Sequence, residues 1–169
     1  KGNCMFSSLK HNLKGFLIHF GVDSFGAVQI IKFLQIQLVR QYFFRFRFNG
    51  DKEFIEEHYP SMEKYIANLI ENYGFEGPIP RYGDWLAYDL IEKSYISKAY
   101  YALDAQIMGM LHYILGNYDK SEEYNDLYFE IRDDFRKTCI GEDGDLLPEY
   151  RKQTGYLLAL YTDMFDDDE

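Results

Sequence analysis

Residues 97–116 read SKAYYALDAQIMGMLHYILG, and this stretch decides the fold class. Its apolar side chains recur at three- and four-residue steps and form one stripe: Tyr100, Leu103, Ile107, Leu111 and Ile114. This period is that of an α-helix with one buried face. Gly116 can end the helix, because glycine readily adopts the left-handed conformation of a C-terminal cap. Ser94 or Ser97 is expected to cap its start.

A second amphipathic helix is predicted to begin near Lys120. Its apolar face carries Tyr124, Leu127, Tyr128, Ile131 and Phe135, and acidic residues occupy much of the opposite face. Only a few residues connect the two helices, so we expect them to pack as an antiparallel helical hairpin.

Helical periodicity continues on both sides of this hairpin. Apolar residues recur at helical spacing between residues 51 and 73, with Pro60 in their midst. Because proline is tolerated in a first helical turn but not in an interior, we predict a short helix followed by a longer one that begins near Pro60. A last helix is predicted from about Gln153 to Met164. The expected fold class is therefore all-α.

Residues 1–49 have a different character. Residues 44–48 read FRFRF, a period of two that predicts a strand, and the rest of the segment is irregular. Residues 1–50 carry seven basic residues and one acidic residue, a net charge of +6, whereas residues 51–169 carry 11 basic and 27 acidic residues, a net charge of −16. We therefore predict an atypical basic, aromatic segment at 1–49 and a helical domain at 50–169.

Composition excludes several classes of protein. The 169 residues are 47% hydrophobic, enough to bury a core, and contain only two Cys, too few for a disulfide scaffold. The four His show no metal-ligand spacing, so no metal or cofactor is expected. His112 beside the apolar stripe is predicted to be a buried, hydrogen-bonded histidine, and Cys139 a buried apolar group.

Charge and hydropathy also bear on partners and compartment. The net charge is −10, and an acidic body repels nucleic acid and anionic membrane. No stretch reaches the roughly 18 apolar residues of a membrane-spanning helix, so neither nucleic acid nor membrane is an expected partner. No signal peptide stands out, and the compartment is not assigned. The start at Lys1 rather than Met indicates a fragment or a processed product.

Two alternative functions arise from local motifs. Residues 116–124 resemble the turn of a tetratricopeptide repeat, which would make the chain a helical-repeat interaction module. Such repeats recur about 34 residues apart, and the stretches at Tyr82 and Tyr150 do not repeat the pattern. The aromatic and arginine residues at 40–48 fit a nucleic-acid platform but lack the glycines of an RNA-recognition motif. The repeat module remains the alternative function.

The segment Tyr82-Gly-Asp-Trp-Leu-Ala87 contains the only Trp of the chain. The indole of Trp85 can stack on the apolar face of a pyranose, and the carboxylate of Asp84 can accept hydrogen bonds from sugar hydroxyls. An Asp followed by an anchoring Trp is equally typical of a helix start. The motif alone therefore leaves a sugar site and a helix cap both open.

Four motifs in order resemble the catalytic six-hairpin domain of bacterial α-L-rhamnosidases over about residues 50–165. They are Gly50-Asp-Lys-Glu-Phe-Ile-Glu-Glu-His-Tyr-Pro-Ser-Met62, then Tyr82–Ala87, then Ile96-Ser-Lys-Ala-Tyr-Tyr-Ala102 closing on Leu115-Gly116, and Gly144-Asp-Leu followed by Gln153-Thr-Gly-Tyr-Leu-Leu-Ala-Leu160. The resemblance implies helical hairpins that form part of an (α/α)6 toroid around a central pocket. It also implies a glycoside hydrolase that cleaves terminal α-L-rhamnosides with inversion, using an acid and a second carboxylate as base.

The resemblance implies that Trp85, Asp84 and Tyr82 contact a rhamnose-containing glycan or glycoside. It assigns no catalytic residue, because the family's acid motif lies upstream of this stretch and its base lies downstream. We therefore expect the chain alone to be inactive and, with an open arc of hairpins, to self-associate through exposed apolar faces. The family's Gly-Trp-x-Asp-Ala type motif is missing before Gly50, which leads to the hypothesis that residues 1–49 are out-of-frame or foreign.

Overall fold

The computed structural model describes residues 39–40, 43–44, 46–48, 50, 52–78 and 89–165, which all belong to one compact unit spanning residues 36–169. Its named helices are α3 (Lys52–Tyr73), α4 (Lys93–Leu115), α5 (Tyr118–Cys139) and α6 (Gln153–Tyr161), with a 3-10 turn η1 (Pro148–Tyr150) before α6. Within these residues no strand forms, and Ile140 and Leu146 make a single antiparallel bridge. The predicted all-α fold class is confirmed.

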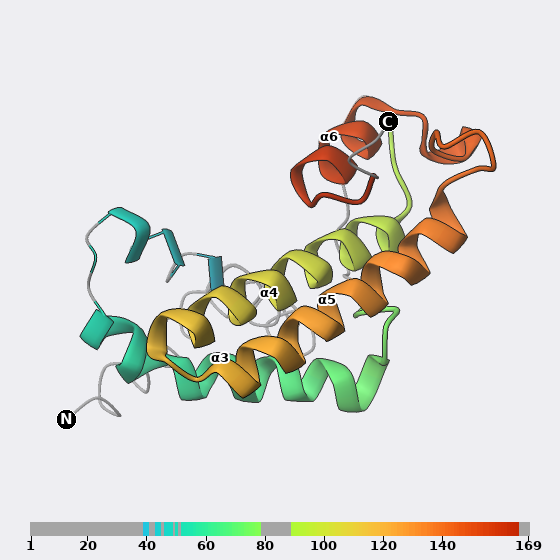
Figure 1. The fold of residues 1–169 in the computed structure, drawn as a ribbon. Helices are drawn as coiled ribbons and strands as arrows, with labels where there is room; N and C mark the ends of the chain where they lie inside the picture. Colours follow the sequence, from blue (N-terminus) through green and yellow to red (C-terminus); the bar gives the residue numbers. More distant parts are fainter. Residues whose placement is uncertain are drawn as a thin grey trace, which may run out of the picture. The chain divides into compact units, whose positions relative to one another are not determined.

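α4 and α5 lie side by side as the predicted helical hairpin (Figure 1). Gly116 ends α4 with a φ of 80°, in the left-handed region, and Asn117 follows it directly before α5. The N–H of Gly116 donates to the carbonyl oxygen of Tyr113 at 3.0 Å, and the N–H of Asn117 donates to that of His112 at 2.9 Å. These bonds satisfy carbonyl groups that the helix end leaves open and reverse the chain within two residues.

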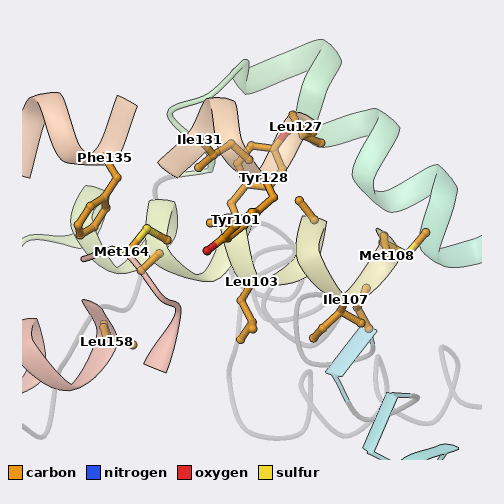
Figure 2. Packing of buried hydrophobic residues seen from close by; sticks show 14 of the residues in the cluster. Tyr101, Leu103, Ile107, Met108, Leu127, Tyr128, Ile131, Phe135, Leu158 and Met164 are labelled. Carbon is orange, nitrogen blue, oxygen red and sulfur yellow. The ribbon is translucent and has the colours of Figure 1, made fainter. Parts of the chain in front are cut away.

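α4 is the central helix of the core. Fourteen of its 23 residues are buried. Figure 2 shows Tyr101 of α4 beside Tyr128 of α5, whose buried positions include most of the predicted face: Leu127, Tyr128, Ile131 and Phe135. At one end of the pair, Lys98 Nζ lies 2.5 Å from an Asp134 carboxylate oxygen and links the two helices. α3 and α6 also pack against α4.

Three local predictions are wrong. α3 runs unbroken through Pro60, because Ile55, Met62 and Ile66 lie on one buried face of a single helix and their packing outweighs the missing backbone hydrogen bond. No serine caps α4, which begins four residues before Ser97 and follows Glu92 without a side-chain cap.

The third wrong prediction is the strand at residues 44–48. The described residues between 39 and 48 are helical rather than extended, and Phe43 and Phe46, one helical turn apart, pack against the core. An alternation of Phe and Arg over only five residues does not distinguish a strand from a helix, and here Phe44 and Phe48 are exposed while Phe46 packs inward.

The described part of the basic segment joins the core through a buried ion pair. Val39 is 1% exposed. Arg40 Nε donates to Asp104 Oδ1 at 3.3 Å, and its guanidinium lies 3.9 Å from the ring centroid of Tyr100. Burial raises the pKa of Asp104 to about 7, against the lowering effect of Arg40. The division of the chain at residue 49 stays a prediction.

None of the helices in the described ranges is long and apolar enough to cross a membrane.

Candidate functional site at the start of α4

The predicted sugar-binding residues Tyr82, Asp84 and Trp85 lie outside the described residues, so their roles stay predictions. The described residues on either side fix where this segment begins and ends. Ser97 Oγ donates to the carbonyl oxygen of Pro78, and Lys152 Nζ lies 3.6 Å from Asp89 Oδ1. Both ends of segment 79–88 are therefore anchored near the start of α4.

Aromatic side chains connect this end of the hairpin to the residues that precede and begin α6. Tyr95, in the first turn of α4, stacks on Tyr150 with ring centroids 4.8 Å apart and donates to the carbonyl oxygen of Gly155 at 2.7 Å. Tyr150 Oη in turn donates to Glu92 Oε2 at 3.2 Å. Burial raises the pKa of Tyr95 above its ordinary value and that of Tyr150 to about 12. Both phenols therefore remain protonated hydrogen-bond donors at neutral pH.

A charged cluster follows in the loop between α5 and α6. Arg151 donates through Nη2 to Asp143 Oδ2 at 2.8 Å, and its Nε lies 3.1 Å from Asp145 Oδ2. Tyr156 Oη donates to Asp145 Oδ1 at 2.9 Å. The backbone N–H of Asp145 and the Arg151 guanidinium lower the pKa of Asp143, so its carboxyl is ionised at neutral pH.

Sequence reasoning did not identify this cluster. Residues 142–145 form a turn, and the sequence analysis predicted no partner for Asp145. The available signal was the motif Gly144-Asp-Leu followed by Tyr156, which carries part of the family resemblance. In the part of the chain that the structure describes, no group of three His, Cys, Asp or Glu residues could hold a metal ion.

The contacts of this cluster hold the loop in place, and its carboxyl groups differ from those of a glycosidase acid. A glycosidase acid needs a carboxyl with a raised pKa, and its partner carboxylate must be free to accept a proton from water. Asp143 has a lowered pKa, and the Asp145 carboxylate accepts the single hydrogen of the Tyr156 hydroxyl, which lies 2.9 and 3.1 Å from its two oxygens. Asp104 has a raised pKa but is buried against Arg40 within the core. None of these three carboxyl groups therefore combines a raised pKa with an accessible position in the described structure.

Two other predicted residues are buried as expected. Cys139 lies in the core, and burial raises the pKa of its thiol. His112 is fully buried and stacks on Tyr124 with ring centroids 5.0 Å apart. Its predicted hydrogen bond is not found, because neither ring nitrogen has a partner and Nε2 lies 3.6 Å from Glu63 Oε1. Burial of the ring lowers the pKa of His112, because a buried site disfavours the charged imidazolium.

Two solved structures have a fold similar to that of this chain. One is an α-L-rhamnosidase from Streptomyces avermitilis complexed with L-rhamnose, with a TM-score of 0.63 and 28% identity over 70% of this chain. Another is an α-L-rhamnosidase from Dictyoglumus thermophilum, with a TM-score of 0.60 and 25% identity over 71% of this chain. The match spans only 11% and 14% of the lengths of those two proteins. A comparison with curated proteins finds no match.

The sequence itself matches a family description. Residues 36–169 match the bacterial alpha-L-rhamnosidase 6 hairpin glycosidase domain. The match begins before Gly50, where the sequence motifs first show the resemblance. The helical hairpin, the two solved relatives and this match agree on fold and family. The chain belongs to the bacterial α-L-rhamnosidase six-hairpin glycosidase family.

Proposed function

We propose that this chain forms part of a glycosidase domain that hydrolyses terminal α-L-rhamnosides with inversion of configuration. The observation that carries the proposal is the family match over residues 36–169. A relative at 28% identity is an α-L-rhamnosidase whose structure contains L-rhamnose, which supports rhamnose as the sugar recognised. The tetratricopeptide-like alternative gains no support, since α3 and α6 differ in length, with 22 and nine residues, and form no second hairpin like α4–α5 in the described chain.

Within this function we assign sugar binding to the segment anchored at the start of α4. Trp85 would stack on the apolar face of the sugar ring and Asp84 would accept hydrogen bonds from its hydroxyls, with Tyr82 beside them. The contacts of Pro78 and Asp89 support this assignment, because the residues that flank the segment are tied to Ser97 and Lys152. The 169-residue chain alone is expected to bind the sugar weakly and to cleave no rhamnoside.

The experiment uses the single Trp as its reporter. Titration of the purified chain with L-rhamnose should change the Trp85 emission at millimolar sugar, whereas D-rhamnose, its mirror image, should have a much smaller effect. Asp84→Asn should weaken the response at least tenfold, and Asp119→Asn, in the first turn of α5 far from α6, should not. The same preparation should release no aryl alcohol from an aryl α-L-rhamnoside. An equal response to both enantiomers contradicts the site, and measurable release contradicts the inactivity of the isolated chain.

A further inference from the structure

His112 lies inside a junction of three helices. It belongs to the last turn of α4, and its side chain is fully buried. Tyr124 of α5 stacks on the imidazole, with ring centroids 5.0 Å apart and an interplanar angle of 17°. The ring of Tyr59 on α3 stands at 88° to the imidazole, also with centroids 5.0 Å apart. Burial raises the pKa of both phenols, so one titratable imidazole lies between two uncharged rings from different helices.

This imidazole makes no hydrogen bond although it is buried. Neither Nδ1 nor Nε2 has a partner, and Glu63 Oε1 on α3 lies 3.6 Å from Nε2, beyond hydrogen-bond distance. Most buried polar groups in proteins are hydrogen-bonded, so a fully buried ring without a partner is an exception that calls for an explanation. The neutral ring fits this site better than the charged one, because a charged ring would bury two N–H donors without acceptors.

The charged groups that face His112 do not compensate for its burial. On α3, Glu63 favours the protonated ring, but its side chain is 31% exposed, so water screens the carboxylate. On α5, Lys120 and Glu123 form an ion pair, and their effects on the ring are opposite in sign. Burial is therefore the largest influence on the pKa of His112, and it lowers this pKa.

We propose that protonation of His112 in mildly acidic solution releases α3 from the α4–α5 hairpin, which makes this junction an acid-sensitive switch. A protonated imidazole needs acceptors for two N–H groups, and the closed junction supplies none at hydrogen-bond distance. Movement of α3 would take Tyr59 and Glu63 away from the ring and admit water, which can accept both hydrogen bonds.

α3 is the helix whose release costs least. α5 follows α4 after a turn of two residues, and the two helices pack side by side along most of their length (Figure 1). α3 contacts α4 less extensively, buries only four of its 22 residues, and is separated from α4 in the sequence by residues 74–92. Because opening on the α3 side exposes less apolar surface than separating the hairpin, it requires less free energy.

The direction of the pH effect follows from the two states. Release returns His112 to an ordinary pKa of about 6.5, and the closed junction holds its pKa below that value. The closed junction therefore loses stability as the pH falls below about 6.5. Asp104 acts with the opposite sign, because its pKa is raised to about 7 and its protonation in acid stabilises the folded chain. Loosening of α3 in acid is thus the opposite of what Asp104 predicts.

Hydrogen exchange measured by mass spectrometry at pH 7 and pH 5 tests the proposal on the full chain. No sugar is present, so the outcome is independent of the proposed function. Protection factors are compared, because they correct for the intrinsic pH dependence of exchange. Those of α3 should fall by about 3- to 25-fold, and the upper limit is set by a histidine of pKa 6.5 that is protonated only in the released state. Those in the middle of α4 and α5 should not fall.

Three variants assign the effect to His112. His112→Phe keeps an aromatic ring against Tyr124 but removes the titratable group, so the fall in α3 should disappear. Glu63→Gln removes the carboxylate that favours the charged ring, so the fall should be at least as large as in the wild type. His58→Gln is the matched control, because it removes the other histidine of the described residues, which lies on α3, and it should leave the fall unchanged.

Far-UV circular dichroism shows whether each variant is folded, and Glu63→Gln keeps the proposal testable if His112→Phe is not. Four results would each overturn the proposal. They are equal protection of α3 at both pH values in the wild type, a fall that persists in His112→Phe, a smaller fall in Glu63→Gln or His58→Gln, and an equal fall in α3 and α5.

Discussion

α4 and α6 are both rich in apolar residues and lie against each other, yet they differ in how much of their surface is covered. α4 buries 14 of its 23 residues, and α6 buries three of nine. α4 meets α3, α5 and α6 (Figure 1). α6 meets the rest of the unit through one face and leaves the other to solvent. The comparison shows that apolar composition alone does not determine how much of a helix is buried. The number of neighbouring helices that pack against it does.

The largest expected effect comes from truncating a side chain on the covered helix. Leu111→Ala removes a fully buried side chain of α4 and leaves a cavity, so the free energy of unfolding should fall by about 2–5 kcal/mol. Leu157→Ala on the open face of α6 is the matched control and should change it by less than about 0.5 kcal/mol. Urea denaturation followed by circular dichroism measures both. Equal losses would remove the distinction between the two helices.

The next effect concerns the buried carboxyl group of Asp104 on α4. Folding raises the pKa of Asp104 from an ordinary 3.8 to about 7, chiefly by burial. A raised folded-state pKa stabilises the protein below the unfolded value, and this contribution is lost as the pH rises from about 4 to 7. The loss should be on the order of 4 kcal/mol. We expect the free energy of unfolding of Asp104→Asn to change less between pH 4 and 7 than that of the wild type. An unchanged dependence on pH would show that other groups cause the loss.

The smallest of the three effects concerns the contact of α6 itself. A Cβ at Gly155 would lie 2.1 Å from the carbonyl oxygen of Tyr150, so Gly155→Ala must push α6 away from the loop before it. The expected cost is about 1–3 kcal/mol. Hydrogen exchange should show faster exchange within 153–161 and unchanged protection in the middle of α4. If protection fell equally in both helices, α6 would be as integral to the core as α4.

The central hairpin was predictable because its signals are local. The apolar stripe of α4, the face of α5 and the glycine that ends α4 can all be identified from residues at most four apart. Glycine is favoured at position 116 because the φ of 80° is strained for other residues. The confirmed burial of Cys139 and His112 follows from the same period.

The failed predictions share a dependence on distant residues. α3 tolerates Pro60 in its interior because its neighbouring residues pack against the core. The residues near Pro60 in the sequence do not reveal this packing. Ser97 was expected to cap a helix, and instead its hydroxyl reaches Pro78, 19 residues earlier in the chain. At the candidate site, the contact of Lys152 with Asp89 forms only when the residues before α6 meet those before α4. The spacing of residues in the sequence does not predict such long-range contacts.

The two-residue turn at Gly116 and Asn117 also affects the order of events during synthesis. A short connection costs little loop-closure entropy, so α4 and α5 can collapse on each other as soon as both exist. The bond between Arg40 and Asp104 spans 64 positions. At about 5–20 residues per second, the nascent chain carries Arg40 and its apolar neighbour Val39 uncovered for roughly 3–13 s before Asp104 is made. During that interval the buried ion pair of Arg40 and Asp104 cannot form.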